Sequence, residues 1–156
     1  MGSFYRLVAF VSDFPSAEDS WGEPQILSDC RKCDTCTKAC PSGAIGSDRF
    51  LLHAERCITF HNERQVEFPA WLKPSWHNCL LGCMVCQKVC PANKDFRKEV
   101  VEGPVFSEIE TATILLCNSR DLFPPGAVQK LEGLDMIEYA NVLGRNLDVL
   151  VKHKYC

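Results

Sequence analysis

The sequence lacks the features that mark several common classes of protein. No apolar run approaches the 18 or more residues that a membrane-spanning helix requires. The first ten residues contain one basic residue, Arg6, and no small-residue cleavage site follows them, so they do not match a secretory signal. Positive charge is not in excess either, since 17 basic and 20 acidic residues give a formal net charge of -3. That balance gives no support to nucleic-acid binding through bulk charge.

Cysteine is the exception, because 11 of the 156 residues are cysteines in an otherwise ordinary globular composition. An odd number leaves at least one thiol unpaired in any disulfide scheme. Without a secretory signal we expect a reducing compartment, the cytoplasm, where clustered cysteines bind metals more often than they form disulfides. The remaining candidates are zinc sites and iron–sulfur clusters.

The first cysteine motif is Cys30-x2-Cys33-x2-Cys36-x3-Cys40-Pro41. In two-cluster ferredoxins, the first three cysteines of such a run bind one 4Fe–4S cluster and the fourth binds the other cluster. Zinc sites prefer two well-separated Cys-x2-Cys pairs. The spacing therefore predicts two iron–sulfur clusters, and the fourth cysteine requires a second motif.

The last three cysteines of a second motif are Cys83, Cys86 and Cys90. Two residues could supply its first cysteine, the more distant Cys57 or the nearer Cys79. Cys57 is favoured because an Ala-Ile pair, a turn and an aromatic and apolar segment lead to it from the first motif, as they do in two-cluster ferredoxins. The second motif is then interrupted by residues 58–82, which we call the insert.

If the fourth cysteine of each motif binds the cluster of the other motif, eight cysteines are assigned to two clusters. The cluster-one set is Cys30, Cys33, Cys36 and Cys90. The cluster-two set is Cys40, Cys57, Cys83 and Cys86. Three cysteines are left over, and we expect them to be packed or exposed thiols: Cys79, Cys117 and Cys156.

A cluster held by four cysteines has no open coordination position, so these ligand sets predict electron transfer rather than catalysis at iron. We expect no catalytic residue in this chain. Two other interpretations remain open, a stand-alone ferredoxin-like protein and a structural module whose clusters brace a surface that binds protein or RNA.

The motifs resemble the double-cluster domain of epoxyqueuosine reductases, and cobalamin-dependent reductive dehalogenases are similar in the same region. The resemblance covers about residues 2–96 and includes Arg56-Cys57-Ile58-Thr59, a pattern whose cysteine joins the second cluster in that family. It implies that a cobalamin-binding domain precedes this chain and that residues 1–29 are the end of that domain plus a linker. The implied partners are a redox donor protein or flavoprotein, the upstream cobalamin domain or an acceptor subunit, and tRNA.

The predicted fold is α+β, with a bacterial two-cluster ferredoxin-like core over residues 30–98 and a helical C-terminal region over residues 99–156. Residues 4–12 are rich in apolar and aromatic side chains and predict a strand. We expect the insert, which carries Trp71 and Trp76, to shield cluster two from water. Docking of a partner is the alternative, because exposed aromatic residues favour interfaces.

Two helix starts have clear signals in the C-terminal region. Ser107-x-x-Glu110 is a capping box ahead of an apolar stretch that ends at Cys117. Pro124-Pro125 predicts a second helix that runs to about Leu131.

A third helix is predicted from Asp135-x-x-Glu138, which resembles another cap. An apolar stripe follows at spacings of three and four residues: Met136, Ala140, Leu143, Leu147 and Leu150. This stripe either packs against its own domain or, alternatively, forms the interface of a dimer.

Basic residues adjoin both cysteine motifs: Arg31, Lys32, Lys38, Lys88, Lys94, Arg97 and Lys98. They either form a solvated rim that offsets the negative charge of the clusters or dock an acidic redox partner or RNA.

Overall fold

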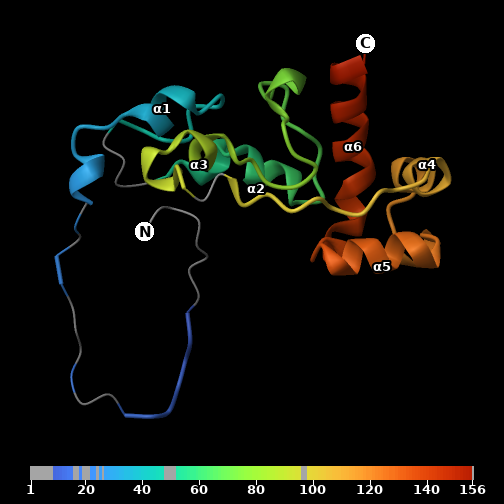
Figure 1. Cartoon of the computed structure of the whole chain (residues 1–156), viewed down its shortest axis with the longest axis horizontal. Helices are drawn as coiled ribbons and strands as arrows, with labels where there is room; N and C mark the ends of the chain where they lie inside the picture. The colour runs from blue at the N-terminus through green and yellow to red at the C-terminus, as the bar shows by residue number, and fades with distance from the viewer. Residues whose placement is uncertain are drawn as a thin grey trace.

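The computed structural model describes residues 9–15, 18, 22, 23, 25, 27–47, 52–95 and 98–155. Three short helices lie in the cysteine-rich part: α1 (Thr35–Ala39), α2 (Ile58–Asn62) and α3 (Val85–Val89). Three longer helices form the C-terminal part: α4 (Glu108–Leu116), α5 (Pro125–Gly133) and α6 (Ala140–Tyr155). The extended residues 99–107 join the two parts (Figure 1). No helix in the described part of the chain is long and apolar enough to cross a membrane.

Single turns of 3-10 helix connect these elements. They comprise Ser28–Cys30, Ala54–Arg56, Pro74–Trp76, Pro91–Asn93, Arg120–Leu122 and Ile137–Tyr139.

Strand structure is sparse among the described residues, where an isolated antiparallel bridge joins Ile45 to Leu52. The predicted strand over residues 4–12 lies largely outside the described residues. Its last four residues, 9–12, are exposed and have no regular secondary structure. The ferredoxin-like α+β fold therefore stays a prediction.

The two cysteine motifs fold alike. Helix α1 contains Cys36 and has Cys40 as its C-cap, and helix α3 contains Cys86 and has Cys90 as its C-cap. Both terminal cysteines have extended backbone, because a proline follows each and disfavours the helical conformation in the residue before it. Helices α1 and α3 pack against each other. The motifs thus present their last two cysteines on adjoining elements.

The capping box at the start of α4 is confirmed. The amide of Glu110 donates to the Ser107 hydroxyl at 3.2 Å, and the amide of Ser107 donates to the Glu110 carboxylate at 2.7 Å. The Lys130 ammonium of α5 lies 2.6 Å from the same carboxylate. The hydrogen bond from Lys130, followed by that from the Ser107 amide, lowers the pKa of Glu110. Helix α4 ends at Leu116 with Cys117 as its C-cap, within one residue of the predicted end.

The other two helices differ in how well their starts were predicted. Helix α5 begins at Pro125 and continues to Gly133, close to the expected range. The predicted cap at Asp135 is wrong, because this residue has a φ of 54° and lies in the turn after α5. A 3-10 turn over Ile137–Tyr139 then leads into α6.

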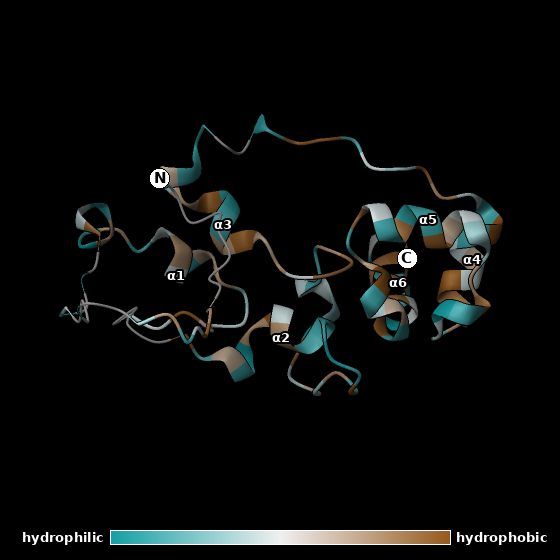
Figure 2. Ribbon diagram, turned by 90° about the horizontal axis from the view of Figure 1, so that it is seen from below, coloured by the Kyte–Doolittle hydropathy of each residue, from teal (hydrophilic) through white to brown (hydrophobic). Residues whose placement is uncertain are grey.

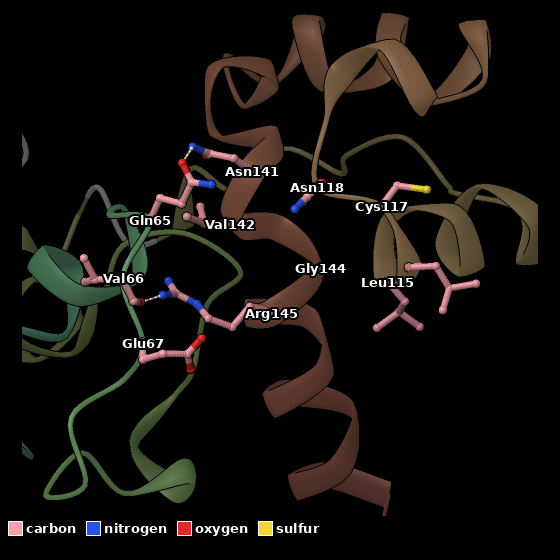
Figure 3. A pocket seen from close by; sticks show the side chains of 11 residues that line it. Gln65, Val66, Glu67, Leu115, Cys117, Asn118, Asn141, Val142, Gly144 and Arg145 are labelled. Carbon is pink, nitrogen blue, oxygen red and sulfur yellow. Dashed lines mark hydrogen bonds between the residues drawn. The ribbon is translucent and has the colours of Figure 1, made fainter.

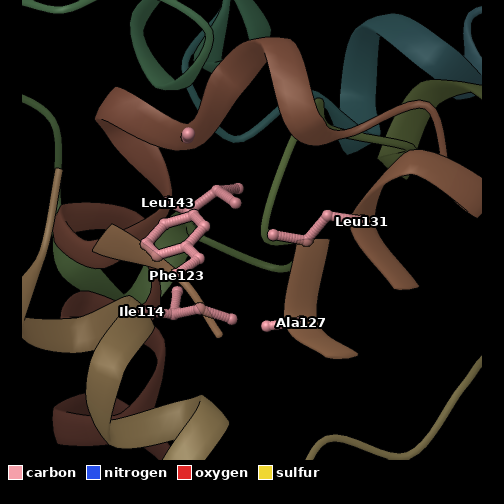
Figure 4. Close-up of a cluster of buried hydrophobic side chains, with 6 residues drawn as sticks. Ile114, Phe123, Ala127, Leu131 and Leu143 are labelled. Carbon is pink, nitrogen blue, oxygen red and sulfur yellow. The ribbon is translucent and has the colours of Figure 1, made fainter. Parts of the chain in front are cut away.

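The hydrophobic core of the C-terminal part is formed by side chains from all three helices and from the α4–α5 connection (Figure 4). Its buried members are Ile114, Phe123, Ala127, Leu131, Ala140 and Leu143. Apolar and polar residues alternate along these helices (Figure 2). The apolar stripe of α6 therefore packs on its own domain, with Met136 and Leu147 against the same core.

The insert contributes a second, smaller buried region. Leu72 and His77 are both 5% exposed. The ring of His77 packs edge-on to Phe68 with centroids 4.6 Å apart, and its Nδ1 atom is buried without a hydrogen-bond partner among the described residues. Burial, and then the nearby positive charge of Arg145, lower the pKa of His77.

We predict that Gly144→Ala destabilises the chain by ~1–3 kcal/mol, the usual effect of overpacking. A Cβ atom at Gly144 would lie 2.6 Å from the Ile114 carbonyl oxygen and 3.0 Å from that of Leu115, so α6 would have to move away from α4. The measurement is the free energy of unfolding by denaturant, followed by far-UV circular dichroism. Gly133→Ala is the matched control, because beyond its chain neighbours and the backbone of its own helix no described atom lies within 4 Å of its Cβ position. Equal stability of Gly144→Ala and wild type would contradict the close approach of the two helices.

We also predict that His77 makes stability fall as the pH is lowered. Its folded pKa lies below the ordinary value of 6.5, so the unfolded chain binds a proton that the folded chain does not. The loss begins as the pH falls through 6.5 and is complete at the lower folded pKa. Denaturant midpoints at pH 8 and pH 5 should differ less in His77→Phe than in wild type. His153→Phe, at an exposed position of α6, is the control and should keep the wild-type difference.

Candidate metal centre

The four cysteines of the cluster-two set line one cavity of about 480 Å³. They come from three separate segments, since Cys40 follows α1, Cys57 precedes α2, and Cys83 and Cys86 lie at the start of α3. Apolar side chains complete much of the wall, among them Ile58, Leu81, Met84 and Val85. The fold therefore gathers four thiols from distant positions around a single space.

The thiols are close enough to influence one another. Burial raises the pKa of the Cys86 thiol, and the neighbouring sulfurs of Cys83, Cys57 and Cys40 raise it further. The backbone amide of Gln87 opposes this shift by donating to Cys86. Four mutually repelling sulfurs are stabilised as thiolates when metal ions lie between them, because a coordinated thiol loses its proton. This electrostatic arrangement suits a positively charged metal group.

Cys40 has a different environment. Burial raises the pKa of its thiol, but hydrogen bonds from the Ser42 hydroxyl and from the amides of Ala44 and Ile45 outweigh burial and lower it. The Ala44 amide lies 3.3 Å from the Cys40 sulfur. Gly43 has a φ of 65°, which turns the backbone so that consecutive amides face one sulfur. The loop after Cys40 is thus built to stabilise a thiolate.

Cys57 and Cys79, the two candidates for the first ligand of the second motif, lie in different places. Cys57 lines the cavity and Cys79 does not. The Cys79 thiol donates to the Asn78 side-chain oxygen at 3.0 Å, and the Asn78 side-chain nitrogen donates to the Cys83 sulfur at 3.3 Å. Cys79 therefore contacts a residue that supports the site, and Cys57 remains the predicted ligand.

The cluster-one set is not among the residues that line this cavity. Cys30 ends a 3-10 turn, and the Cys33 thiol donates to the Thr35 hydroxyl at 3.3 Å. Cys36 lies in α1 and Cys90 directly follows α3, and these two helices are packed together. None of the ten cysteines in the described part of the chain forms a disulfide. No three His, Cys, Asp or Glu side chains within the described ranges are arranged to hold a single metal ion.

The two ends of the insert, rather than its tryptophans, form part of the cavity wall. Residues 58, 59 and 63 line it from one end of the insert, and residues 81 and 82 from the other. Trp71 is 42% exposed and packs on His61, with ring centroids 5.2 Å apart. Trp76 lies near Lys73, whose ammonium is 5.5 Å from the ring centroid. The ends of the insert therefore line the cavity and the two tryptophans do not, and the shielding role stays a prediction.

One of the basic residues beside the motifs, Lys38, is paired within the chain. Its ammonium lies 2.7 Å from the Asp34 carboxylate on the solvent-exposed side of α1. The hydrogen bond to Asp34, followed by the charge of that carboxylate, raises the pKa of Lys38. Arg97 lies outside the described residues.

A second cavity, of about 500 Å³, lies where residues 65–67 of the insert and the end of α4 meet α6 (Figure 3). None of the eight predicted ligands lines it. The Arg145 guanidinium donates to the Val66 carbonyl oxygen, and Asn141 donates to Gln65 at 3.0 Å. The cavity therefore belongs to the junction between the insert and α6 and not to the metal centre.

The asparagines that support the site, Asn62, Asn78 and Asn146, were not predicted from the sequence. For Asn146 a signal was present, because it lies three residues after Leu143 and next to Leu147 and so interrupts the apolar stripe of α6. A buried amide on an apolar helix face requires hydrogen-bond partners elsewhere in the fold. Asn62 and Asn78 carry no comparable signal in the sequence.

Sequence comparison with known proteins finds matches over the cysteine-rich part of the chain. Residues 29–93 match the family described as a 4Fe-4S double cluster binding domain. An epoxyqueuosine reductase of Cyclobacterium marinum is 34% identical over 94 residues, which cover 60% of this chain and 29% of that relative. The epoxyqueuosine reductase of Bacillus subtilis is 34% identical over 93 residues, which cover 60% of this chain and 23% of the relative.

A longer match is found with an epoxyqueuosine reductase of Leadbetterella byssophila. It is 31% identical over 144 residues, which cover 86% of this chain and 45% of that relative. The chain thus spans between 23% and 45% of the length of these relatives. No solved structure is significantly similar to the chain.

We predict that Cys57→Ser lowers the iron content by about four atoms per chain, the content of one 4Fe–4S cluster, because it removes a thiol from the cavity. Cys79→Ser is the matched control and should leave the iron content unchanged. Iron and acid-labile sulfide are measured after anaerobic purification. If Cys79→Ser lost iron and Cys57→Ser did not, Cys79 rather than Cys57 would be the ligand.

Proposed function

We propose that the chain holds two 4Fe–4S clusters and acts as an electron-transfer module, since residues 29–93 match the 4Fe–4S double cluster binding domain family. The observation that carries the proposal is the convergence of Cys40, Cys57, Cys83 and Cys86 on one cavity. These four residues would hold cluster two. Cys30, Cys33, Cys36 and Cys90 would hold cluster one.

The residues around the cavity fit this cofactor. When bound, a cluster with four cysteine ligands exchanges single electrons and offers no open coordination site. The amides around Cys40 stabilise its thiolate form, which is the form that binds metal. Apolar residues of the wall, such as Ile58 and Leu81, limit the access of water. Burial of this kind is one of the factors that set the reduction potential of an iron–sulfur centre.

The packing of α1 on α3 supports a relay between the two clusters. Each helix contains one cysteine of one set and is followed directly by a cysteine of the other set. Contact between the helices therefore keeps the two ligand sets close together. A short separation is what electron transfer between them requires.

We propose further that the electrons serve a reductive reaction in a larger protein or complex. The relatives are named for the reduction of epoxyqueuosine, and this chain spans only part of their length. The acceptor we propose is a cobalamin in an upstream domain or acceptor subunit, and the donor is a redox protein or flavoprotein. The final substrate would be an epoxide on a modified nucleoside of tRNA, with a carbon–halogen bond as the dehalogenase-like alternative.

The test is anaerobic metal analysis followed by reductive titration of the purified chain. We expect about eight iron and eight sulfide per chain, the content of two 4Fe–4S clusters, and reversible bleaching of the visible absorption by about two electrons. Clusters that stay oxidised at every accessible potential would contradict electron transfer and support a structural role. A colourless preparation that holds zinc would contradict the iron–sulfur assignment altogether.

A further inference from the structure

The insert creates a geometric problem in the cluster-two set. In the first motif two or three residues separate neighbouring cysteines, so a local turn holds their sulfurs together. Between Cys57 and Cys83, residues 58–82 intervene, and no local turn can hold these two thiols beside one another. Contacts between the two ends of the insert must do so.

Asn62 makes that contact. Its side-chain nitrogen donates to the Gly82 carbonyl oxygen at 2.7 Å, and the Gly82 amide donates to its side-chain oxygen at 3.0 Å. Asn62 is the last residue of α2, the helix that starts directly after Cys57, and Gly82 directly precedes Cys83. The pair of hydrogen bonds thus links the two segments that present these cysteines to the cavity.

Asn146 of α6 also forms hydrogen bonds near the two ends of the insert. Its side-chain nitrogen donates to the Asn62 carbonyl oxygen at 2.7 Å and to the Leu80 carbonyl oxygen at 2.9 Å. One amide group therefore binds the beginning and the end of the insert together. Both asparagines are buried, with Asn62 at 0% and Asn146 at 1% exposure.

The neighbouring residue of α6 strengthens this link. The Arg145 guanidinium donates to the His61 carbonyl oxygen at 3.1 Å and lies 3.9 Å above the Phe68 ring centroid. Arg145 also donates to the Asn146 side-chain oxygen at 3.2 Å, so the two neighbouring side chains contact the insert as one linked pair.

We infer that Asn62 and Asn146 are positioning residues for cluster two: they hold Cys57 and Cys83 at one site across the insert. The inference rests on the proposed function, because it assumes that these thiols bind a cluster. Neither residue lines the cavity itself. Substitution of residues that orient metal ligands typically costs 10- to 100-fold in metal affinity. The effect should fall on cluster two, since cluster one takes three of its ligands from the uninterrupted first motif.

The experiment compares Asn62→Leu and Asn146→Leu with wild type in the full chain, purified and reconstituted without oxygen. Leucine is close to asparagine in size but removes every hydrogen bond of the side chain. We expect Asn62→Leu to retain about four iron per chain, half of the two-cluster content, with the electron paramagnetic resonance signal of one reduced cluster. Asn146→Leu should release iron from one cluster to a chelator at least about tenfold faster than wild type does.

Asn141→Leu is the matched control, because Asn141 is an exposed asparagine of α6 whose side-chain nitrogen donates to the side chain of Gln65 rather than to the backbone beside either cysteine. It should keep both clusters and the wild-type rate of iron release. Asn62→Asp provides a milder change, since it keeps the acceptor for the Gly82 amide and loses the donor. We expect its rate of iron release from one cluster to lie between those of wild type and Asn62→Leu.

The outcomes separate this inference from the proposed function. If wild type itself binds no clusters, the proposed function fails. If wild type binds two clusters and both asparagine variants keep them with unchanged spectra and release rates, only the positioning role is overturned. Loss of both clusters to the same degree in every variant would also overturn it, because the inference assigns these amides to cluster two.

Discussion

The cluster-two site depends on directional hydrogen bonds from buried amides. Apolar packing can bring segments together but does not determine which atoms face each other, because the hydrophobic effect is non-directional. The paired bonds between Asn62 and Gly82 fix both the distance and the orientation of the two backbone segments that lead to the cavity. Losing one partner would leave buried polar groups unsatisfied, at a cost of about 1–3 kcal/mol each. The two ends of the insert therefore have one strongly preferred arrangement relative to each other.

The same hydrogen bonds join the helical part to the cysteine-rich part. The amide of Asn146 can reach the insert only if α6 is held in place, and α6 is held by the core around Leu143 and Ile114. Gly144 allows the axis of α6 to approach the end of α4 closely. On the opposite side of the helix, Arg145 and Asn146 are then directed at the insert. The helical part acts as a scaffold for the cysteine-rich part.

Features that depend on neighbours in the sequence were predictable. The cysteine spacings, the Ser107–Glu110 capping box and the proline start of α5 each involve residues within one turn of each other. The asparagine network was not predictable, because its hydrogen bonds join residues 20 and 84 positions apart. The cap expected at Asp135 failed for a related reason. The motif fits the sequence, but the turn that closes α5 places this residue at positive φ before the next helix can begin.

Two motifs of the same cysteine pattern thus acquire different surroundings. The segment with Cys36 and Cys40 and the segment with Cys86 and Cys90 fold into equivalent helices. In the cluster-two set, Cys57 and Cys83 lie directly on either side of the insert, and hydrogen bonds of Asn62 and of Asn146 in α6 tie the segments beside them together. Its sulfurs also receive their own hydrogen bonds, from the Ala44 amide and from the Asn78 side chain. Hydrogen bonds to sulfur and solvent exposure set the potential of a cluster even when the ligands are identical. We therefore expect the two clusters to have different reduction potentials, even though each is held by four cysteines.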